Sequence, residues 1–176
     1  MTETKQEWRG RLGALTQDEL DAFLEQGINM SLSCLKPNGD PYSTICWYEW
    51  RDGAFWIVVR ERSRWAGYLQ NDPRVAFNIA TWNPYVKMQA EGRAEVVETP
   101  ALGGRWVEIT RRMSYRYLGP NGPDYLESTM KQPRWLFSIK PRNVKTWQGV
   151  GWARQYWVEG TGGPTYEEAH QLVETD

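Results

Sequence analysis

Glycine turns between short apolar segments constrain the fold of this 176-residue chain more than any other feature. Asn38-Gly39 and Asp52-Gly53 each separate two segments rich in large apolar residues. Asn-Gly and Asp-Gly supply the positive φ that tight hairpins require. Residues 28–59 are therefore predicted to form a three-stranded antiparallel meander.

The hairpin at Asn38-Gly39 also predicts the state of the two cysteines. A two-residue turn there would set Cys34 opposite Ser43 and Cys46 opposite Ser31, so the thiols would not face each other. The spacing of the two cysteines does not fit a zinc-binding or redox pair, and two cysteines are too few for a disulfide framework. We expect two free thiols that pack as small hydrophobic groups.

The strands of this meander carry apolar side chains on both faces. Residues 55–59 are apolar throughout, and Ile45 and Trp47 alternate with Cys46 and Tyr48. Strands of this kind are covered on both sides, as in a barrel wall packed by helices or by a partner chain. A small antiparallel barrel is therefore predicted.

The remaining elements follow from capping signals and periodicity. Thr16 and Glu19 form a capping box at the start of a helix over 16–26, and Ser63 is a candidate N-cap for a short second helix. Thr99-Pro100 is typical of a helix start, and it predicts an inserted helix over 99–118. The other predicted elements are strands 74–80 and 87–98, one strand or a bent pair over 134–148, and a short helix capped by Thr165 and Glu168 in a tail over 149–176. Residues 1–176 are predicted to form a single domain with helices at the ends and rim of the barrel.

Charge and hydropathy exclude several classes of function. Lys plus Arg number 21 against 22 Asp plus Glu, which leaves no overall positive charge for binding nucleic acid. The longest apolar run, residues 54–59, is far shorter than a membrane span, and the N-terminus lacks the apolar core of a signal peptide. A cytoplasmic protein without a membrane or nucleic-acid partner is expected. The only histidine, His170, gives little basis for a metal cage or a catalytic triad.

The basic segment Arg60-Glu61-Arg62-Ser63-Arg64 is the best candidate site. It lies where an apolar strand ends and a short helix begins. Helix N-termini present free N–H groups to anions, and guanidinium groups add donors that match phosphate oxygens. An anion site is one interpretation; a solvated loop whose arginines pair with nearby carboxylates is the other.

Tryptophan is unusually abundant, with 11 residues. Several of them fall on or beside the strands around the candidate anion site. Such side chains could stack on a planar conjugated ligand, but they also suit a core or a dimer interface. The residues concerned are Trp47, Trp50, Trp56, Trp65 and Trp82.

Taken together, these stretches resemble the split-barrel flavoprotein superfamily, which includes pyridoxamine-phosphate-oxidase-like proteins and deazaflavin-dependent reductases. The most specific stretch is Asp72-Pro73-Arg74-Val75, which follows the basic helix start. The others are Leu20-Asp21-Ala22-Phe23-Leu24, Asn38-Gly39-Asp40-Pro41, Gly92-Arg93-Ala94-Glu95-Val96, and the last strand with Pro141 and Trp147.

The resemblance implies a six-stranded antiparallel split β-barrel that forms a homodimer, with FMN or the deazaflavin coenzyme F-420 in each interface groove. It places the cofactor phosphate at Arg60, Arg62, Ser63 and Arg64, beside Trp65, where many members have lysine. It places the ring system along two strands, at Ser43, Thr44, Ile45 and Trp47 and at Val58 and Val59.

Three functions remain open. The first is a flavin- or deazaflavin-dependent oxidoreductase that transfers hydride to or from a small conjugated organic substrate. Such chemistry needs no side-chain nucleophile, because the cofactor carries the electrons, and the sequence indicates no catalytic residue. The second is a non-catalytic protein that binds a flavin, a tetrapyrrole or a lipid-like ligand. The third is a structural dimerisation domain without a ligand.

Overall fold

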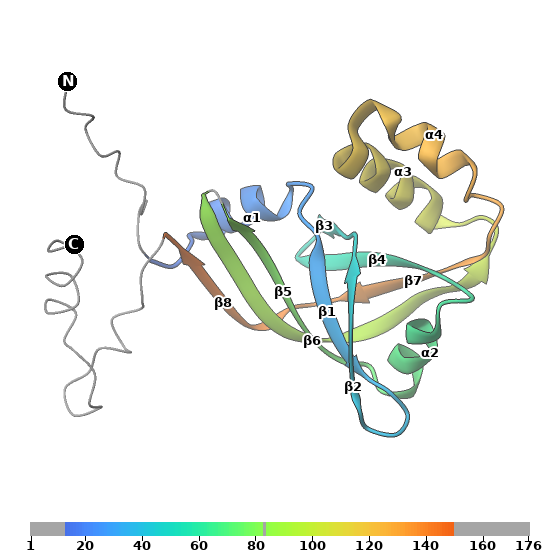
Figure 1. Cartoon of the computed structure of the whole chain (residues 1–176), viewed down its shortest axis with the longest axis horizontal. Helices are drawn as coiled ribbons and strands as arrows, with labels where there is room; N and C mark the ends of the chain where they lie inside the picture. The colour runs from blue at the N-terminus through green and yellow to red at the C-terminus, as the bar shows by residue number, and fades with distance from the viewer. Residues whose placement is uncertain (1–12, 83, 150–176) are drawn as a thin grey trace, which may run out of the picture.

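An antiparallel sheet of eight strands organises residues 13–82 and 84–149, the part of the chain that the computed structural model describes. Hydrogen-bonded neighbours follow the order β2-β1-β5-β6-β7-β4-β3, and β8 pairs with β6. Figure 1 shows the sheet curving around an interior, with helices at its rim. The strands are β1 (Met30–Leu35), β2 (Pro41–Cys46), β3 (Glu49–Arg51), β4 (Ala54–Arg60), β5 (Arg74–Trp82), β6 (Tyr85–Ala101), β7 (Arg134–Ile139) and β8 (Arg142–Gln148).

Among the described residues, one helix precedes the first strand and the others lie between strands in the chain. They are α1 (Gln17–Leu24), α2 (Arg64–Asn71), α3 (Arg105–Leu118), a 3-10 turn η1 (Gly119–Asn121) and α4 (Gly122–Glu127). The predicted mainly β, antiparallel fold with peripheral helices is confirmed. The predicted C-terminal helix at Thr165 and Glu168, and His170, lie outside the described residues.

The predicted number of six strands is wrong, because two of the predicted strands bend. The middle strand of the predicted meander divides at Trp47-Tyr48 into β2 and β3. The last segment, predicted as one strand or a bent pair, is a bent pair that divides at Lys140-Pro141 into β7 and β8. At the first bend the backbone N–H of Tyr48 donates to the hydroxyl of Tyr117 on α3, at 3.3 Å. The two ends of the sheet, β2 and β3, do not pair, so the barrel stays open.

The predicted meander is in fact two separate hairpins. β1 pairs with β2 and β3 with β4, whereas β4 takes β7 as its other neighbour. The first loop has three residues, because Lys36 N–H donates to the Asp40 carbonyl and Gly39 takes the left-handed conformation, with φ 88°. The predicted register is therefore one residue off: Cys34 lies opposite Tyr42. Both thiols are free, as expected.

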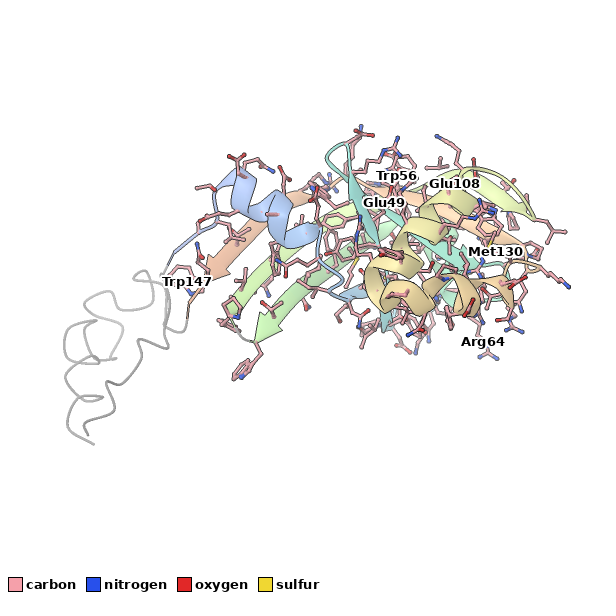
Figure 2. The ribbon with its side chains drawn as sticks, turned by 90° about the horizontal axis from the view of Figure 1, so that it is seen from above. Glu49, Trp56, Arg64, Glu108, Met130 and Trp147 are labelled. Atoms are coloured by element: carbon pink, nitrogen blue, oxygen red, sulfur yellow. The ribbon has the colours of Figure 1, made fainter. Side chains whose placement is uncertain are left out.

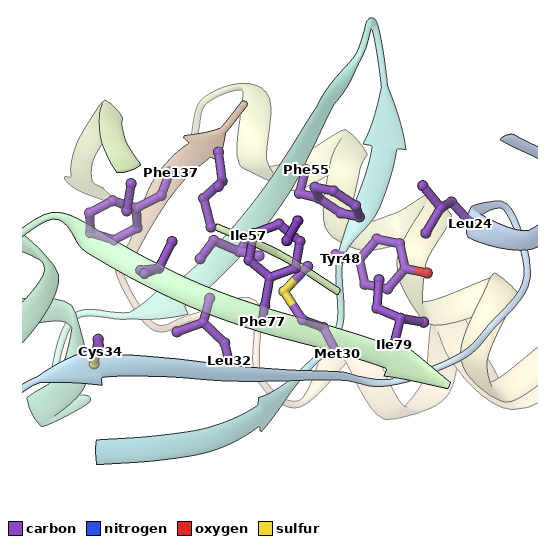
Figure 3. Close-up of a cluster of buried hydrophobic side chains, with 14 of the residues drawn as sticks. Leu24, Met30, Leu32, Cys34, Tyr48, Phe55, Ile57, Phe77, Ile79 and Phe137 are labelled. Carbon is purple, nitrogen blue, oxygen red and sulfur yellow. The ribbon is translucent and has the colours of Figure 1, made fainter. Parts of the chain in front are cut away.

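The interior of the curved sheet holds the main apolar core. Figure 3 shows part of this core, with side chains from β1, β4, β5 and β7 meeting between the layers. Leu20, Phe23 and Leu24 add the buried face of α1, and Leu69 adds that of α2. The capping box of Thr16 and Glu19 that starts α1 is confirmed, although the helix ends at Leu24. The period-two pattern of β5 is also confirmed, since Val75, Phe77 and Ile79 are all buried.

β4 is covered on both faces, as its composition predicts. Ile57 and its neighbours on one face enter the main core, while Trp56 and Val58 on the other face pack against a second cluster under α3. The buried members of this second cluster are Trp106, Ile109, Met113 and Leu136. The α3 helix therefore supplies the outer layer that β4 needs.

The predicted start of the inserted helix at Thr99-Pro100 is wrong. These residues belong to β6, whose last residue, Ala101, pairs with Arg134 of β7. α3 begins only at Arg105, after Gly104 with φ 125°. Glu98 takes the capping role instead, because its carboxylate accepts the backbone N–H groups of Arg105 and Trp106, at 3.1 and 3.4 Å. Negative charge at a helix N-terminus is favourable, so a side chain from the preceding strand replaces the local cap.

The turn between α2 and β5 predicts a pH-dependent contribution to stability. The Asp72 carboxylate accepts hydrogen bonds from the guanidinium and the backbone N–H of Arg74. These bonds lower the pKa of Asp72 to about 2 from an ordinary value of 3.8. Because the pKa is depressed in the folded state, the stabilisation is complete above the ordinary pKa and is lost as the pH falls from 3.8 toward 2.

Thermal unfolding of Asp72→Asn beside the natural chain measures this contribution. We expect the natural chain to have the higher Tm at pH 6, and the difference between the two Tm values to shrink steadily below pH 4. Other carboxyl groups titrate equally in both proteins, so the difference isolates Asp72. A difference in Tm that stays constant down to pH 2 would show that ionisation of Asp72 does not stabilise the fold.

Candidate functional site

A cavity of about 520 Å³ lies between β2 and β4 on one side and the helices α3 and α4 on the other. In Figure 1 the pair α3 and α4 stands over the end of the sheet formed by β3, β4 and β7. This volume falls within the range typical of small-molecule sites. Seven of the residues proposed from the sequence line the cavity: Ile45, Trp47, Val58, Val59, Arg60, Ser63 and Trp65.

Four of the proposed residues do not line the cavity. Ser43 and Thr44 lie farther along β2, toward the hairpin loop. Arg62 is exposed in the turn before α2, and Arg64 is exposed at the start of that helix, where its side chain projects from the surface (Figure 2). The structure thus divides the basic segment into one arginine that faces the cavity and two that face solvent.

Arg134 is a cavity residue that the sequence analysis missed. It is the first residue of β7, lies directly opposite Arg60 of β4, and is only 7% exposed. One terminal nitrogen, Nη2, donates to the carbonyl and the hydroxyl of Thr129, at 3.1 and 2.7 Å. Burial lowers the pKa of Arg134, and the positive charge of Arg60 lowers it further. No local sequence signal reveals this contact, because β4 and β7 are far apart in the chain.

The cavity wall is positively charged and lacks acidic side chains. None of the lining residues is Asp or Glu, and within the described residues neither Arg60 nor Arg134 forms an ion pair. Ser63 occupies the N-cap position of α2, but its hydroxyl makes no capping bond to that helix. Two guanidinium groups, a hydroxyl and the start of a helix therefore meet at one end of the cavity, and all of them favour an anion.

Aromatic and apolar side chains form much of the remaining cavity wall. Trp47 stacks on Tyr117 of α3, with ring centres 4.9 Å apart and planes inclined by 10°, and Tyr125 of α4 lies 5.7 Å from the same indole. Met113, Leu126 and Val58 add apolar surface. A cavity that combines guanidinium groups with aromatic and apolar side chains suits a flat conjugated molecule that carries an anionic group.

Side-chain acid-base chemistry has few candidates in this cavity. Burial raises the pKa of the Cys46 thiol to about 12, so that thiol stays protonated and is a poor nucleophile. Burial likewise raises the pKa of Tyr117 to about 12, and its hydroxyl donates to the Ile28 carbonyl. The arrangement can bind and orient a ligand, but neither of these two groups releases its proton near neutral pH.

Within residues 13–82 and 84–149 no helix is both long and apolar enough to cross a membrane. No group of three or more His, Cys, Asp or Glu side chains among them is arranged to hold a metal ion.

An open antiparallel sheet with peripheral helices is the fold of the split-barrel family. The family model described as pyridoxamine 5'-phosphate oxidase matches residues 16–148. The chain belongs to this family. None of the curated proteins matches it in sequence.

Solved structures give the same fold. A conserved hypothetical protein from Mycobacterium tuberculosis is 28% identical with a TM-score of 0.63, over 82% of this chain and 90% of that one. The heme storage protein HutZ from Vibrio cholerae is 15% identical with a TM-score of 0.58, over 76% and 96%. An FAD-binding protein from Mesorhizobium loti is 17% identical with a TM-score of 0.57, over 79% and 99%. These similarities extend over nearly the whole of each relative.

Proposed function

We propose that this chain binds a flavin-type cofactor in the cavity between β4 and α3, and that it is an oxidoreductase acting on a small conjugated substrate. The observation that carries the proposal is the unpaired cationic end of the cavity, formed by Arg60, Arg134 and Ser63 beside the start of α2. The family and the similarity to an FAD-binding protein support a cofactor of this type.

The residues present fit such a cofactor. Arg60, Ser63 and the first N–H groups of α2 would hold its phosphate, while the surface of Ile45, Trp47 and Val58 would face the ring. A bound flavin or deazaflavin supplies reversible hydride transfer, which explains why the cavity needs no nucleophile of its own. Met113 of α3 and Leu126 of α4 add apolar side chains to the same cavity.

The binding experiment is a titration of the purified chain with FMN, FAD and coenzyme F-420, followed by absorption and by the quenching of tryptophan fluorescence. Arg60→Met removes one charge-assisted contact, so the affinity for the preferred cofactor should fall about 10- to 100-fold. Arg142→Met is the matched control, because Arg142 is exposed on β8 and lies outside the cavity. Equal affinities for the natural chain and Arg60→Met would reject the site.

A non-catalytic binding protein is the second candidate function. The absence of acidic side chains from the cavity wall and the similarity to a heme storage protein favour it. Turnover separates the two functions: the cofactor-loaded chain is given NAD(P)H, or reduced deazaflavin, with a panel of quinones, enones and tetrapyrroles. Hydride transfer to any of these acceptors supports the oxidoreductase, whereas binding without turnover across the panel supports the binding protein.

We also propose that the functional unit is a homodimer whose partner subunit closes the mouth of the cavity. Ile45 lines the cavity and is nevertheless 71% exposed, so one chain alone leaves a large apolar side chain of its own site in water. Light scattering during gel filtration should give twice the chain mass of 20.5 kDa. A monomer that binds the cofactor at full affinity would contradict the dimer.

A further inference from the structure

Trp47 carries a hydrogen-bond donor that the fold leaves unused. Three other tryptophans donate their indole N–H groups within the chain: Trp50 to Asp21, Trp56 to Arg51 and Trp106 to Ala101. The indole N–H of Trp47 donates to none of residues 13–82 and 84–149, and its nitrogen is not fully buried. Trp47 lines the cavity, so this donor is available to a molecule bound there.

The position of this donor is fixed by Tyr117. The two rings stack with their centres 4.9 Å apart and their planes inclined by 10°. The Tyr117 hydroxyl accepts the backbone N–H of Tyr48 and donates to the Ile28 carbonyl, at 3.3 and 2.9 Å. Because both rings are held in place before a ligand arrives, little conformational entropy is lost when the indole N–H forms a hydrogen bond.

Tyr125 of α4 is a second unused donor of the cavity wall. Its ring centre lies 5.7 Å from that of Trp47, and its hydroxyl makes no hydrogen bond in the part of the chain that the structure describes. The helix that carries it begins at Gly122, where a Cβ atom would overlap the backbone carbonyl of Ser114 on α3. This close contact holds α4, and with it Tyr125, against α3.

The surroundings of the two donors favour a ligand that accepts hydrogen bonds. The pKa of Arg134 is lowered by burial and by the charge of Arg60, and Tyr125 acts in the opposite direction, so the phenol lies near that guanidinium. The cavity wall contains no carboxylate that could accept a hydrogen bond from a ligand. A carbonyl oxygen has two lone pairs and can accept from both donors. A carbonyl conjugated to a ring or a double bond is also flat enough to stack on aromatic side chains.

We propose that Trp47 and Tyr125 bind the carbonyl oxygen of the substrate, and that conjugated carbonyl compounds such as enones and quinones are the substrate class of the oxidoreductase. This inference rests on the proposed function. Trp47 follows β2 on the sheet, whereas Tyr125 belongs to α4, so the two donors would orient the carbonyl as well as bind it. A conjugated hydrocarbon of the same shape would leave both donors unpaired.

The variant Tyr125→Phe tests the site, because it removes the hydroxyl and keeps the ring. The cofactor-loaded chain is dialysed to equilibrium against coumarin, a flat bicyclic molecule with a conjugated carbonyl, and against naphthalene, which has a similar shape and no carbonyl. In Tyr125→Phe the affinity for coumarin should fall about 3- to 10-fold, whereas the affinity for naphthalene should stay within about 2-fold. In Trp47→Phe the affinity for coumarin should fall more than that for naphthalene. Tyr115→Phe is the matched control, because Tyr115 is 63% exposed on α3 and lies outside the cavity.

The infrared spectrum of bound coumarin separates a direct contact from a structural role. A hydrogen bond weakens the C=O bond, so the carbonyl stretch should lie at a lower wavenumber in the natural chain and in Tyr115→Phe than in Tyr125→Phe. An unchanged stretch, or an equal loss of affinity for both probes, would overturn the proposal. A loss of cofactor affinity in Tyr125→Phe without an effect on coumarin would also overturn it, since the hydroxyl would then hold the cofactor ring.

The same measurements distinguish this site from the proposed function. If a flavin binds and Tyr125→Phe binds coumarin as well as the natural chain does, the substrate class is wrong and the flavin function stands. If no flavin binds, the proposed function fails, and dialysis of the cofactor-free chain decides the site. A selective loss of coumarin affinity in Tyr125→Phe then supports a carbonyl-binding site, and an equal affinity rejects that site as well.

Discussion

Replacing Arg112 with methionine is expected to lower the free energy of unfolding by about 3 to 5 kcal/mol. Arg112 of α3 makes two hydrogen bonds of 2.8 Å to the carboxylate of Glu49 on β3, and the Glu49 side chain is only 2% exposed. These bonds raise the pKa of Arg112. The variant leaves a buried carboxylate whose nearest remaining cation is Arg51, at 4.0 Å, so a loss toward the lower end is expected. Urea denaturation measures it.

Two further variants show whether the buried pair is the cause. Arg111→Met changes the next residue of α3, whose partner Glu108 is exposed, and it should cost less than about 1 kcal/mol. The double variant Glu49→Leu with Arg112→Met removes both charges and should recover most of the lost stability. A double variant as unstable as Arg112→Met would show that Glu49 is not the source of the loss. Figure 2 shows Glu49 beside α3. The ion pair of Glu49 with Arg112 therefore connects this helix to β3 of the sheet.

Trp106→Ala is expected to lower the free energy of unfolding by about 3 to 5 kcal/mol, because it opens a cavity beneath α3. The Trp106 side chain is fully buried, and its indole N–H donates to the Ala101 carbonyl, at 3.1 Å. The same indole supports the guanidinium of Arg134. The variant should therefore also weaken binding of the proposed cofactor in the cavity. Thermal and urea unfolding check the first effect, and the titration with FMN checks the second.

Trp82→Ala is the matched control for the loss of an indole. Trp82 is 84% exposed and contacts the ring of Tyr85, so its removal should cost less than about 1 kcal/mol. Trp106→Phe keeps much of the apolar volume and should lose clearly less stability than Trp106→Ala. Similar losses for the alanine and phenylalanine variants would show that packing under α3 does not depend on the volume of this side chain.

The sequence alone determined the elements whose signals are local. The capping box of Thr16 and Glu19, the alternation along β5 and the glycine turns of the two hairpins each depend on residues a few positions apart. The family resemblance added the proposed positions of a cofactor phosphate and ring. Seven of its eleven proposed residues lie along one cavity. Arg60, Ser63 and Trp65 do so because they are neighbours in sequence at a strand-to-helix junction.

Only the tertiary structure decided where strands bend and which distant residues meet. The hydroxyl of Tyr117 accepts a hydrogen bond from the backbone N–H of Tyr48, 69 residues away in the sequence, at the point where one predicted strand divides into two. Pairing with β7 keeps Thr99-Pro100 in a strand, where its local pattern favours a helix start. The same pairing sets Arg134 opposite Arg60. Propensity acts through near neighbours, whereas these contacts depend on how a curved sheet brings remote strands together, so the charge of the cavity emerges only when the chain has folded.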